Sequence, residues 1–294
     1  QQTVAASLYY FNMGEIQVTT EEQPGGTGLY MRPNEFSIDA AYSRKFSDNF
    51  SGGIAFRYVR SDISDRSANG GGTTSPGNAF AADISFFNRK EVRLDDKDAQ
   101  WNLGVNIANI GNKISYSERQ EYFLPTELRI GNSLNIELDE YNELALSLDL
   151  HKLLVPSPAI YPDGEDGEAE PIGKGDPEDP VAVAMVKSFY DAPGILQPDS
   201  SRNVLAEELK EIKAGFGIEY WYANQFAVRG GYYYEDQMKG NRKYFSLGMG
   251  LKLNVFAIDV SYLIPQGPTS PLANTIRFSL AFNFNGGQNN KQNR

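Results

Sequence analysis

The feature of this sequence that most constrains the fold is a strict alternation of apolar and polar side chains. In residues 274–284 one set of alternate positions is apolar: Ile276, Phe278, Leu280, Phe282 and Phe284. The intervening positions hold Arg277, Ser279, Ala281 and Asn283. Because successive side chains of a strand point to opposite faces, this spacing predicts a β-strand with one apolar and one polar face.

The same alternation recurs along nearly the whole chain. Reading it by period two predicts about twelve strands, at residues 3–19, 34–46, 50–64, 78–88, 99–109, 124–136, 141–154, 209–222, 225–236, 242–253, 256–264 and 273–284. In each of these segments one face is strongly apolar and the other carries small, polar or charged residues. The sequence therefore predicts an all-β protein.

Composition excludes several classes of protein and site. The formal net charge of −11 argues against nucleic acid as a partner, since binding to phosphates needs clustered Lys and Arg. There is no Cys and only one His, His151, so disulfides, thiolate metal sites and multi-histidine metal sites are excluded. No apolar run reaches 18 residues, which excludes helical membrane spans but not β-barrel spans. We expect no cofactor, and partners that are proteins.

The links between the predicted strands alternate in length. Those at 264–273, 236–242, 154–209, 109–124, 64–78 and 19–34 are mostly long, and those at 253–256, 222–225, 136–141 and 46–50 are tight. The link at 89–98 breaks the short series. Long loops on one side and tight turns on the other are typical of a transmembrane, antiparallel, up-and-down β-barrel. A barrel of twelve or more strands is too wide to fill with side chains, so we expect its apolar face to contact lipid.

Residues 155–208 interrupt this pattern. The segment begins with prolines and continues with the acidic residues Asp163, Glu165, Asp166, Glu168, Glu170, Asp176, Glu178 and Asp179. A stretch of this composition is expected to be extended or mobile in water. An apolar patch follows, formed by Val181, Val183, Met185, Val186, Phe189 and Tyr190. An exposed apolar patch is a candidate contact surface, and these six residues are our predicted partner-binding site.

The chain carries no motif that specifies an enzyme. The glycines around Lys174 lack the spacing of a phosphate-binding loop, and the acidic run lacks the ligand pattern of a calcium loop. His151 follows Asp149 on the polar face of a predicted strand, without a matched nucleophile motif. We interpret it as a polar residue of the barrel interior.

Arginines on the polar faces allow two interpretations. Arg57, Arg129, Arg229 and Arg277 either form a constriction that selects anions or pair with acidic residues across the interior, such as Asp149, Glu219 and Asp259. Both signs of charge occur in comparable number, which favours pairing.

Several segments resemble the PorV family of outer-membrane proteins of the type IX (Por) secretion system. They are SLYYFNMGEI at 7–16, RPNEF at 32–36 with DAAY at 39–42, NLG at 102–104 with NIG at 109–111, LPTELRIG at 124–131, GIEYWY at 217–222 and VRGGYY at 228–233. The resemblance covers most of the chain apart from the acidic loop. Its motifs are structural and not catalytic.

The resemblance implies a FadL-like barrel of fourteen strands with an N-terminal segment, in the outer membrane of a Gram-negative bacterium. We therefore expect residues 1–294 to form a single barrel domain that lacks its N-terminal strands and carries an extracellular insertion at 155–208. The implied function is that of a non-enzymatic carrier. It associates with the large translocon barrel, accepts cargo proteins through their C-terminal domain and passes them to the surface-attachment machinery.

Two other functions stay open at this point. A FadL-like transporter of hydrophobic small molecules shares the barrel but needs an internal apolar pocket. A general porin needs a wide, open interior. Outer-membrane lipid is a further expected partner of any barrel with this apolar face.

Overall fold

The computed structural model describes residues 1–17, 19, 21–28, 30–63, 75–117, 120–161, 170–267 and 275–283. Twelve of the strands in these residues form one antiparallel sheet in chain order, as predicted. They are β1 (Gln2–Asn12), β4 (Asn34–Lys45), β5 (Phe50–Asp62), β6 (Gly77–Leu94), β7 (Lys97–Gly111), β10 (Glu127–Glu137), β11 (Asn142–Leu153), β14 (Lys213–Tyr222), β15 (Phe226–Tyr234), β16 (Lys243–Lys252), β17 (Phe256–Pro265) and β18 (Ile276–Phe282).

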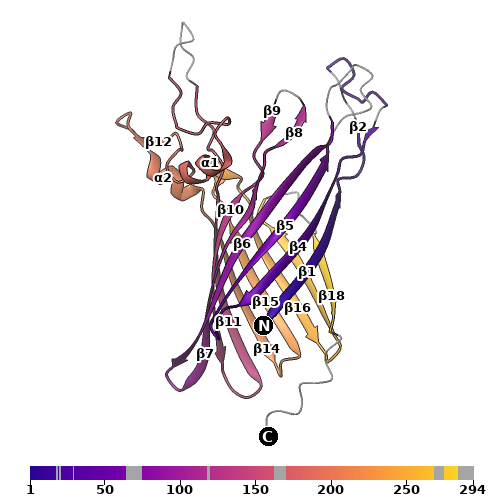
Figure 1. Cartoon of the computed structure of the whole chain (residues 1–294), viewed down its shortest axis with the longest axis vertical. Helices are drawn as coiled ribbons and strands as arrows, with labels where there is room; N and C mark the ends of the chain where they lie inside the picture. The colour runs from indigo at the N-terminus through magenta and orange to yellow at the C-terminus, as the bar shows by residue number, and fades with distance from the viewer. Residues whose placement is uncertain are drawn as a thin grey trace. The chain divides into compact units, whose positions relative to one another are not determined.

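The remaining elements are short and lie in the links between these strands. They are β2 (Ile16–Gln17), β3 (Tyr30–Met31), β8 (Ile114–Ser117), β9 (Gln120–Tyr122), α1 (Val181–Lys187), β12 (Ile195–Leu196), β13 (Arg202–Asn203), α2 (Val204–Lys210) and the 3-10 helix η1 (Gln237–Lys239). Figure 1 shows the long antiparallel strands and labels six of the short elements: β2, β8, β9, α1, β12 and α2. The pairs β2–β3, β8–β9 and β12–β13 are two-stranded sheets of their own.

The chain divides into two compact units, which we describe separately. Unit 1 comprises residues 1–86, 106–128 and 153–208, and unit 2 comprises residues 87–105, 129–152 and 209–294. In unit 1, β4 pairs with β1 on one side and with β5 on the other. In unit 2, consecutive pairings connect β11, β14, β15, β16, β17 and β18.

The predicted strands at 3–19 and 209–222 are too long. The predicted strand at 3–19 ends at Asn12, whose side-chain oxygen accepts a hydrogen bond from the Gly14 N–H at 2.8 Å. Gly14 has a φ of 80°, which turns the chain out of the sheet. The predicted strand at 209–222 begins at Lys213, because α2 occupies the residues before it.

The link that broke the predicted short series is in fact tight. β6 extends to Leu94 and β7 begins at Lys97, so only Asp95 and Asp96 join them. Asp95 has a φ of 53°, a conformation that Asp and Asn adopt in two-residue hairpin turns. The strands are longer than predicted, and the alternation of tight turns and long links therefore extends to this hairpin.

Both units expose the apolar faces of their strands, as predicted. In unit 1, Leu8 faces Ile38 and Val4 faces Tyr42 across the β1–β4 ladder, and all four side chains are exposed. In unit 2 the exposed apolar residues include Ile218, Val228, Leu247, Val260 and Phe278. A sheet that exposes this many large apolar side chains is stable in lipid and not in water.

Unit 1 also contains a buried hydrophobic cluster beside the strands. Ala79 and Ala81 of β6 pack with Ile114 of the β8–β9 hairpin and with Leu124, and Tyr116 covers them. The Tyr116 hydroxyl donates to Ser61 Oγ at 2.9 Å, and Ser61 donates to Glu35 Oε1 at 2.6 Å. These contacts hold the link after β7 against the ends of β4, β5 and β6.

Candidate partner-binding surface

The insertion at 155–208 is folded where the structure describes it, at residues 155–161 and 170–208. We expected the acidic stretch before residue 181 to be extended or mobile, and its described residues are instead held by backbone hydrogen bonds. Ile160 and Ile172 exchange backbone hydrogen bonds of 2.8 Å, and the Lys174 N–H donates to Asp191 O at 2.8 Å. Asp163, Glu165, Asp166 and Glu168 lie outside the described residues. The apolar patch is therefore built on an ordered module.

Buried acidic side chains tie the parts of the insertion together. Asp191 is fully buried, and its Oδ2 accepts from the Ser157 N–H at 3.2 Å. Glu208 of α2 is also buried and accepts from the Ala192 N–H at 3.0 Å. A Cβ at Gly175 would lie 1.9 Å from Ser157 O, so only glycine permits this close approach of the two segments. The segments before α1, after α1 and in α2 are thus joined.

Helix α1 carries the predicted partner-binding residues. Pro180 precedes its first residue, where a fixed φ is compatible with a helix start. Ala184 and Ser188 are buried and form the inner face of this turn. Lys187 Nζ pairs with Asp179 Oδ2 at 2.7 Å, and this hydrogen bond raises the pKa of Lys187 above its ordinary value. The helix is therefore fixed at both its inner face and its polar side.

The structure places most of the six predicted residues on the surface. Val183, Val186, Phe189 and Tyr190 are exposed, and Val181 and Met185 are half-buried. Lys174 Nζ lies 5.8 Å from the centroid of the Tyr190 ring. Sequence reasoning missed Val204 and Leu205 of α2, which are also exposed. The apolar residues of VLAEELK, at positions 204, 205, 206 and 209, recur at a spacing that is typical of a helix and not of a strand, whereas we expected a loop followed by the next strand here.

A second polar feature lies on the strands of unit 1. We call Asp39, Arg57, Asp83 and Asn109 the Arg57 cluster. Arg57 of β5 donates through Nε to Asp39, its direct neighbour on β4, and through Nη2 to Asp83 Oδ2 of β6 at 3.3 Å. Arg57 Nη1 also donates to Asn109 Oδ1 of β7. One guanidinium thereby connects four adjacent strands.

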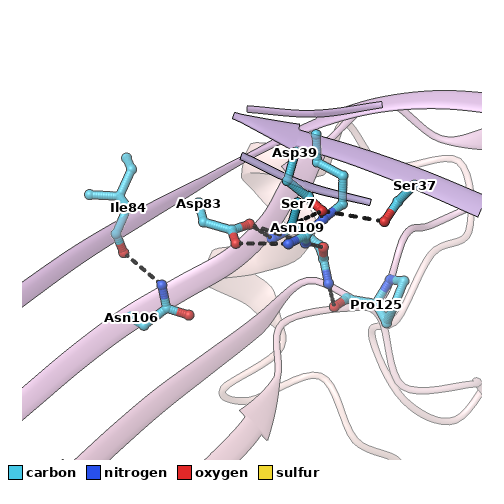
Figure 2. Close-up of polar contacts among 9 residues, drawn as sticks. Ser7, Ser37, Asp39, Asp83, Ile84, Asn106, Asn109 and Pro125 are labelled. Atoms are coloured by element: carbon cyan, nitrogen blue, oxygen red, sulfur yellow. Dashed lines mark hydrogen bonds and ion pairs between the residues drawn. The ribbon is translucent and has the colours of Figure 1, made fainter. Parts of the chain in front are cut away.

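Asn109 completes the Arg57 cluster. It has a φ of 59°, and its backbone N–H donates to Asp83 Oδ1 at 2.8 Å. Its side-chain Nδ2 donates to Pro125 O at 3.1 Å, and its carbonyl accepts from Thr126 Oγ1 at 2.8 Å. Figure 2 shows Asp39, Asp83 and Asn109 converging at this point, with Ser7 and Ser37 beside Asp39 and with Pro125 bound to Asn109.

Unit 2 contains a related group, which we call the Arg229 cluster: Glu219, Trp221, Arg229 and Asp259. Arg229 of β15 donates through Nε to Glu219, its direct neighbour on β14, and through Nη1 to Asp259 of β17. The Trp221 indole N–H donates to Glu219 Oε1 at 2.6 Å, and the guanidinium lies 5.4 Å from the Trp221 ring centroid. Arg229 reaches Asp259 above Gly250 of the intervening strand β16.

These clusters decide between the two interpretations for Arg57 and Arg229. Both arginines pair with carboxylates, as the mixed charges favoured, and Glu219 and Asp259 are among the predicted partners. The pairs join strands that are adjacent or one strand apart in the same sheet, whereas we had expected pairing across the interior. For Arg129 and Arg277 the pairing stays a prediction.

None of the helices in the described part of the chain is long and apolar enough to cross a membrane. Among the same residues, no group of three or more His, Cys, Asp or Glu side chains is arranged to hold a metal ion.

Long antiparallel strands with an exposed apolar face and paired charges on the opposite face define the class of outer-membrane β-barrel proteins. The family model described as "Type IX secretion system protein PorV" matches residues 1–160, more than half of the 294-residue chain. The chain therefore belongs to the PorV family and is an outer-membrane protein of the type IX secretion system.

The solved structures that are similar to this chain include two toluene transporters. TbuX of Ralstonia pickettii is 11% identical with a TM-score of 0.41, and the match covers 95% of this chain and 75% of that one. TodX of Pseudomonas putida is 10% identical with a TM-score of 0.42, covering 89% and 73%. Comparison with curated proteins gives no match.

Proposed function

We propose that this protein is a non-enzymatic carrier of the type IX secretion system. It binds the large outer-membrane translocon barrel, accepts cargo proteins through their C-terminal domain and passes them to the surface-attachment complex. The observation that supports this proposal most directly is the folded insertion, which presents Val183, Val186, Phe189 and Tyr190 to the outside.

The chemistry of this surface suits a protein partner. Two aromatic side chains lie beside two valines on an ordered turn, and aromatic residues commonly provide most of the binding energy at protein interfaces. The neighbouring acidic residues Glu170, Asp176 and Glu178 keep the surroundings hydrated. Because the module is already folded, binding costs less conformational entropy than ordering an extended loop would.

The position of the insertion in the chain supports a partner that binds on the extracellular side. In outer-membrane barrels the long loops face outside and the tight turns face the periplasm. The insertion belongs to the long series, as do the links after β5 and β15, and the turns after β4, β6, β14 and β16 belong to the tight series. We therefore assign the insertion to the extracellular side.

The FadL-like transporter stays a hypothesis, and one observation favours the carrier over it. In unit 2 the polar face of the strands forms a groove of about 530 Å³ whose lining includes Asp149, Glu219 and Arg229. A charged groove disfavours a hydrophobic ligand, because such a ligand cannot replace the hydration of these groups. Hydrophobic ligand retained on the polar face, with no protein partner recovered, would reverse this preference.

The experiment replaces Val183, Val186, Phe189 and Tyr190 together with Ser and measures how much translocon and cargo co-purify in mild detergent. We expect recovery to fall about tenfold, since loss of one or two interface anchors has this effect. Leu196→Ser is the matched control, because Leu196 and Val186 are both 63% exposed but Leu196 lies on β12, outside the patch. Unchanged recovery with the fourfold variant would refute the proposed surface.

A further inference from the structure

A groove of about 510 Å³ lies on the apolar face of unit 2, on the side opposite the Arg229 cluster. It runs over β11, β14, β15 and β16. Its lining contains no charged side chain and consists of Leu146, Ser147, Phe216, Gly217, Ile218, Gly230, Gly231, Tyr232, Phe245, Ser246 and Leu247. Because the outward faces of these strands contact lipid, the groove opens toward the membrane.

Gly230 forms the floor of this groove. It lies on the outward face of β15, between Ile218 of β14 and Leu247 of β16, which are its direct partners in the two ladders. The neighbouring outward residues of β15 are Val228 and Tyr232, so a large apolar side chain would continue the surface here. The absence of a side chain at this one position opens the sheet surface down to the backbone.

Neither backbone conformation nor packing requires glycine at position 230. Its φ lies outside the left-handed region, and an added Cβ would meet only Ile218 Cγ2, at an ordinary contact distance of 3.5 Å. At Gly250 the situation is different, because a Cβ there would lie 2.6 Å from Asp259 Oδ1. A glycine inside a strand weakens the sheet and often marks a place where a ligand approaches the backbone closely.

Toward the β15–β16 link the groove ends in aromatic side chains, and polar side chains follow beyond them. Phe216, Tyr232 and Phe245 lie side by side on three strands, with the Tyr232 and Phe245 ring centroids 4.8 Å apart. The Tyr232 hydroxyl donates to Gln266 at 3.3 Å, and one step further Lys243 Nζ lies 5.0 Å from the Tyr234 ring. Tyr and Lys side chains in this arrangement are typical of the interface between lipid tails and headgroups.

We propose that this groove binds one acyl chain of an anionic membrane lipid, with the lipid phosphate at Lys243. Lipid surrounds the outward face of these strands, and the lining is mostly apolar and holds no charged side chain. Lys243 is the cation at the mouth, since the adjacent Arg242 is bound to Glu235 through Nε at 2.6 Å and Nη2 at 3.0 Å. This inference does not depend on the proposed carrier function.

The test uses the purified protein in detergent, titrated with dioleoyl phosphatidylglycerol and observed by native mass spectrometry. We expect one lipid per chain, and about tenfold weaker binding by Gly230→Leu, whose side chain fills the groove. Val228→Leu is the matched control, because it adds apolar volume on the same face of the same strand outside the groove. If Gly230→Leu does not fold, Gly230→Ala serves instead, with an expected weakening of about threefold.

Headgroup recognition is tested separately with Lys243→Gln. We expect about fivefold weaker binding of phosphatidylglycerol and unchanged binding of dioleoyl phosphatidylcholine, since one basic residue near an anionic lipid has an effect of this size. Equal binding by Gly230→Leu and the parent protein would overturn the proposal. Lipid binding that Val228→Leu weakens as much as Gly230→Leu would also overturn it. A third contrary outcome is that Gly230→Leu lowers translocon recovery and leaves lipid binding unchanged, which would assign the groove to a partner's side chain.

Discussion

The Arg57 cluster of unit 1 and the Arg229 cluster of unit 2 follow the same local plan with different surroundings. In each, an arginine bonds through Nε to the carboxylate directly opposite on the preceding strand and through a terminal nitrogen to a second carboxylate. The second carboxylate lies one strand further on for Arg57, and two strands further on for Arg229. Each cluster contains one positive and two negative groups.

The two clusters differ in burial. The carboxylates of the Arg57 cluster are 14% and 18% exposed, whereas those of the Arg229 cluster are 32% and 43% exposed. Asn109, which is hydrogen-bonded to Pro125 O, covers the Arg57 cluster, while the Arg229 cluster opens into the charged groove on the polar face of unit 2. The comparison indicates that the same ion-pair pattern stabilises the sheet in unit 1 and leaves charges accessible in unit 2.

The strongest way to test this difference is to remove each arginine. Arg57→Ala leaves two poorly hydrated carboxylates without their shared partner, and we expect a loss of about 3 kcal/mol in the free energy of unfolding. Arg229→Ala leaves better hydrated carboxylates, and we expect about 1 kcal/mol. Urea unfolding in detergent micelles, followed by near-UV circular dichroism, measures both values.

Asp83→Asn in the Arg57→Ala background is the control, because it removes one of the unpaired charges and should restore part of the stability. Equal losses for the two arginine variants would show that the difference in burial has no energetic consequence.

Asn109 should account for a large part of the contrast between the clusters. Asn109→Ala removes the side-chain hydrogen bonds with Arg57 and with Pro125 O, and it places alanine at a φ of 59°, which Asn tolerates better than Ala. We expect a loss of about 2 kcal/mol from these two effects together. Asn109→Gly removes the side chain without the conformational penalty, and we expect it to lose only about half as much. Thermal unfolding of both variants separates the two contributions, and equal losses would contradict the role of the positive φ.

The sequence was sufficient to predict the sheet because alternation is a local property. Each of the twelve long strands can be recognised from its own residues, and the apolar face follows from period two. Boundaries failed where a single interaction ends the strand, such as the Asn12 side chain bound to the Gly14 N–H. The two-residue turn at Asp95 and Asp96 was missed because the many charged residues at 89–98 are also typical of a loop.

The features that could not be predicted from the sequence depend on contacts between distant segments. The burial of Asp191 and Glu208 depends on segments up to 34 residues apart, so composition alone indicated an extended or mobile acidic stretch. The pairing of Arg57 with Asp39 and Asp83 requires the register of three strands, and Asn109 enters only through its backbone conformation. The apolar residues at 181–190 could be predicted as a patch because they are close in sequence. Val204 and Leu205 of α2 were missed because they lie further along the chain.

Two glycines of unit 2, Gly250 beside the Arg229 cluster and Gly230 on the opposite face, test how much the Arg229–Asp259 pair stabilises the sheet. Gly250→Ala places a Cβ against Asp259 Oδ1 and 2.8 Å from Arg229 Nη1, so it should displace the Arg229–Asp259 pair. Gly230→Ala on the opposite face has room and gains strand propensity. We expect the free energies of unfolding of the two variants to differ by about 1.5 kcal/mol, with Gly230→Ala the more stable. In the Arg229→Ala background this difference should shrink, and a difference that persists would assign it to backbone effects.

A third arginine–carboxylate pair, Glu235 and Arg242, lies in the link between β15 and β16. It tests how burial affects the strength of such a pair outside the strands. Burial alone would raise the pKa of Glu235, but the hydrogen bonds and charge of Arg242 outweigh it and hold the pKa below the ordinary value of 4.5. The folded state therefore binds this proton less readily than the unfolded state. The contribution of the pair to the free energy of unfolding is complete above pH 4.5 and is lost as the pH falls through the lowered pKa.

We expect Glu235→Gln to lose about 1 kcal/mol in the free energy of unfolding at pH 7 and to remove this part of the acid dependence. Asp236→Asn changes the adjacent acidic residue without touching the pair, so its unfolding curve should keep the acid dependence of the parent protein. If Glu235→Gln and the parent protein lose stability in parallel between pH 5 and pH 3, other carboxylates govern acid unfolding, and the carboxylates of the more open Arg229 cluster become the first candidates.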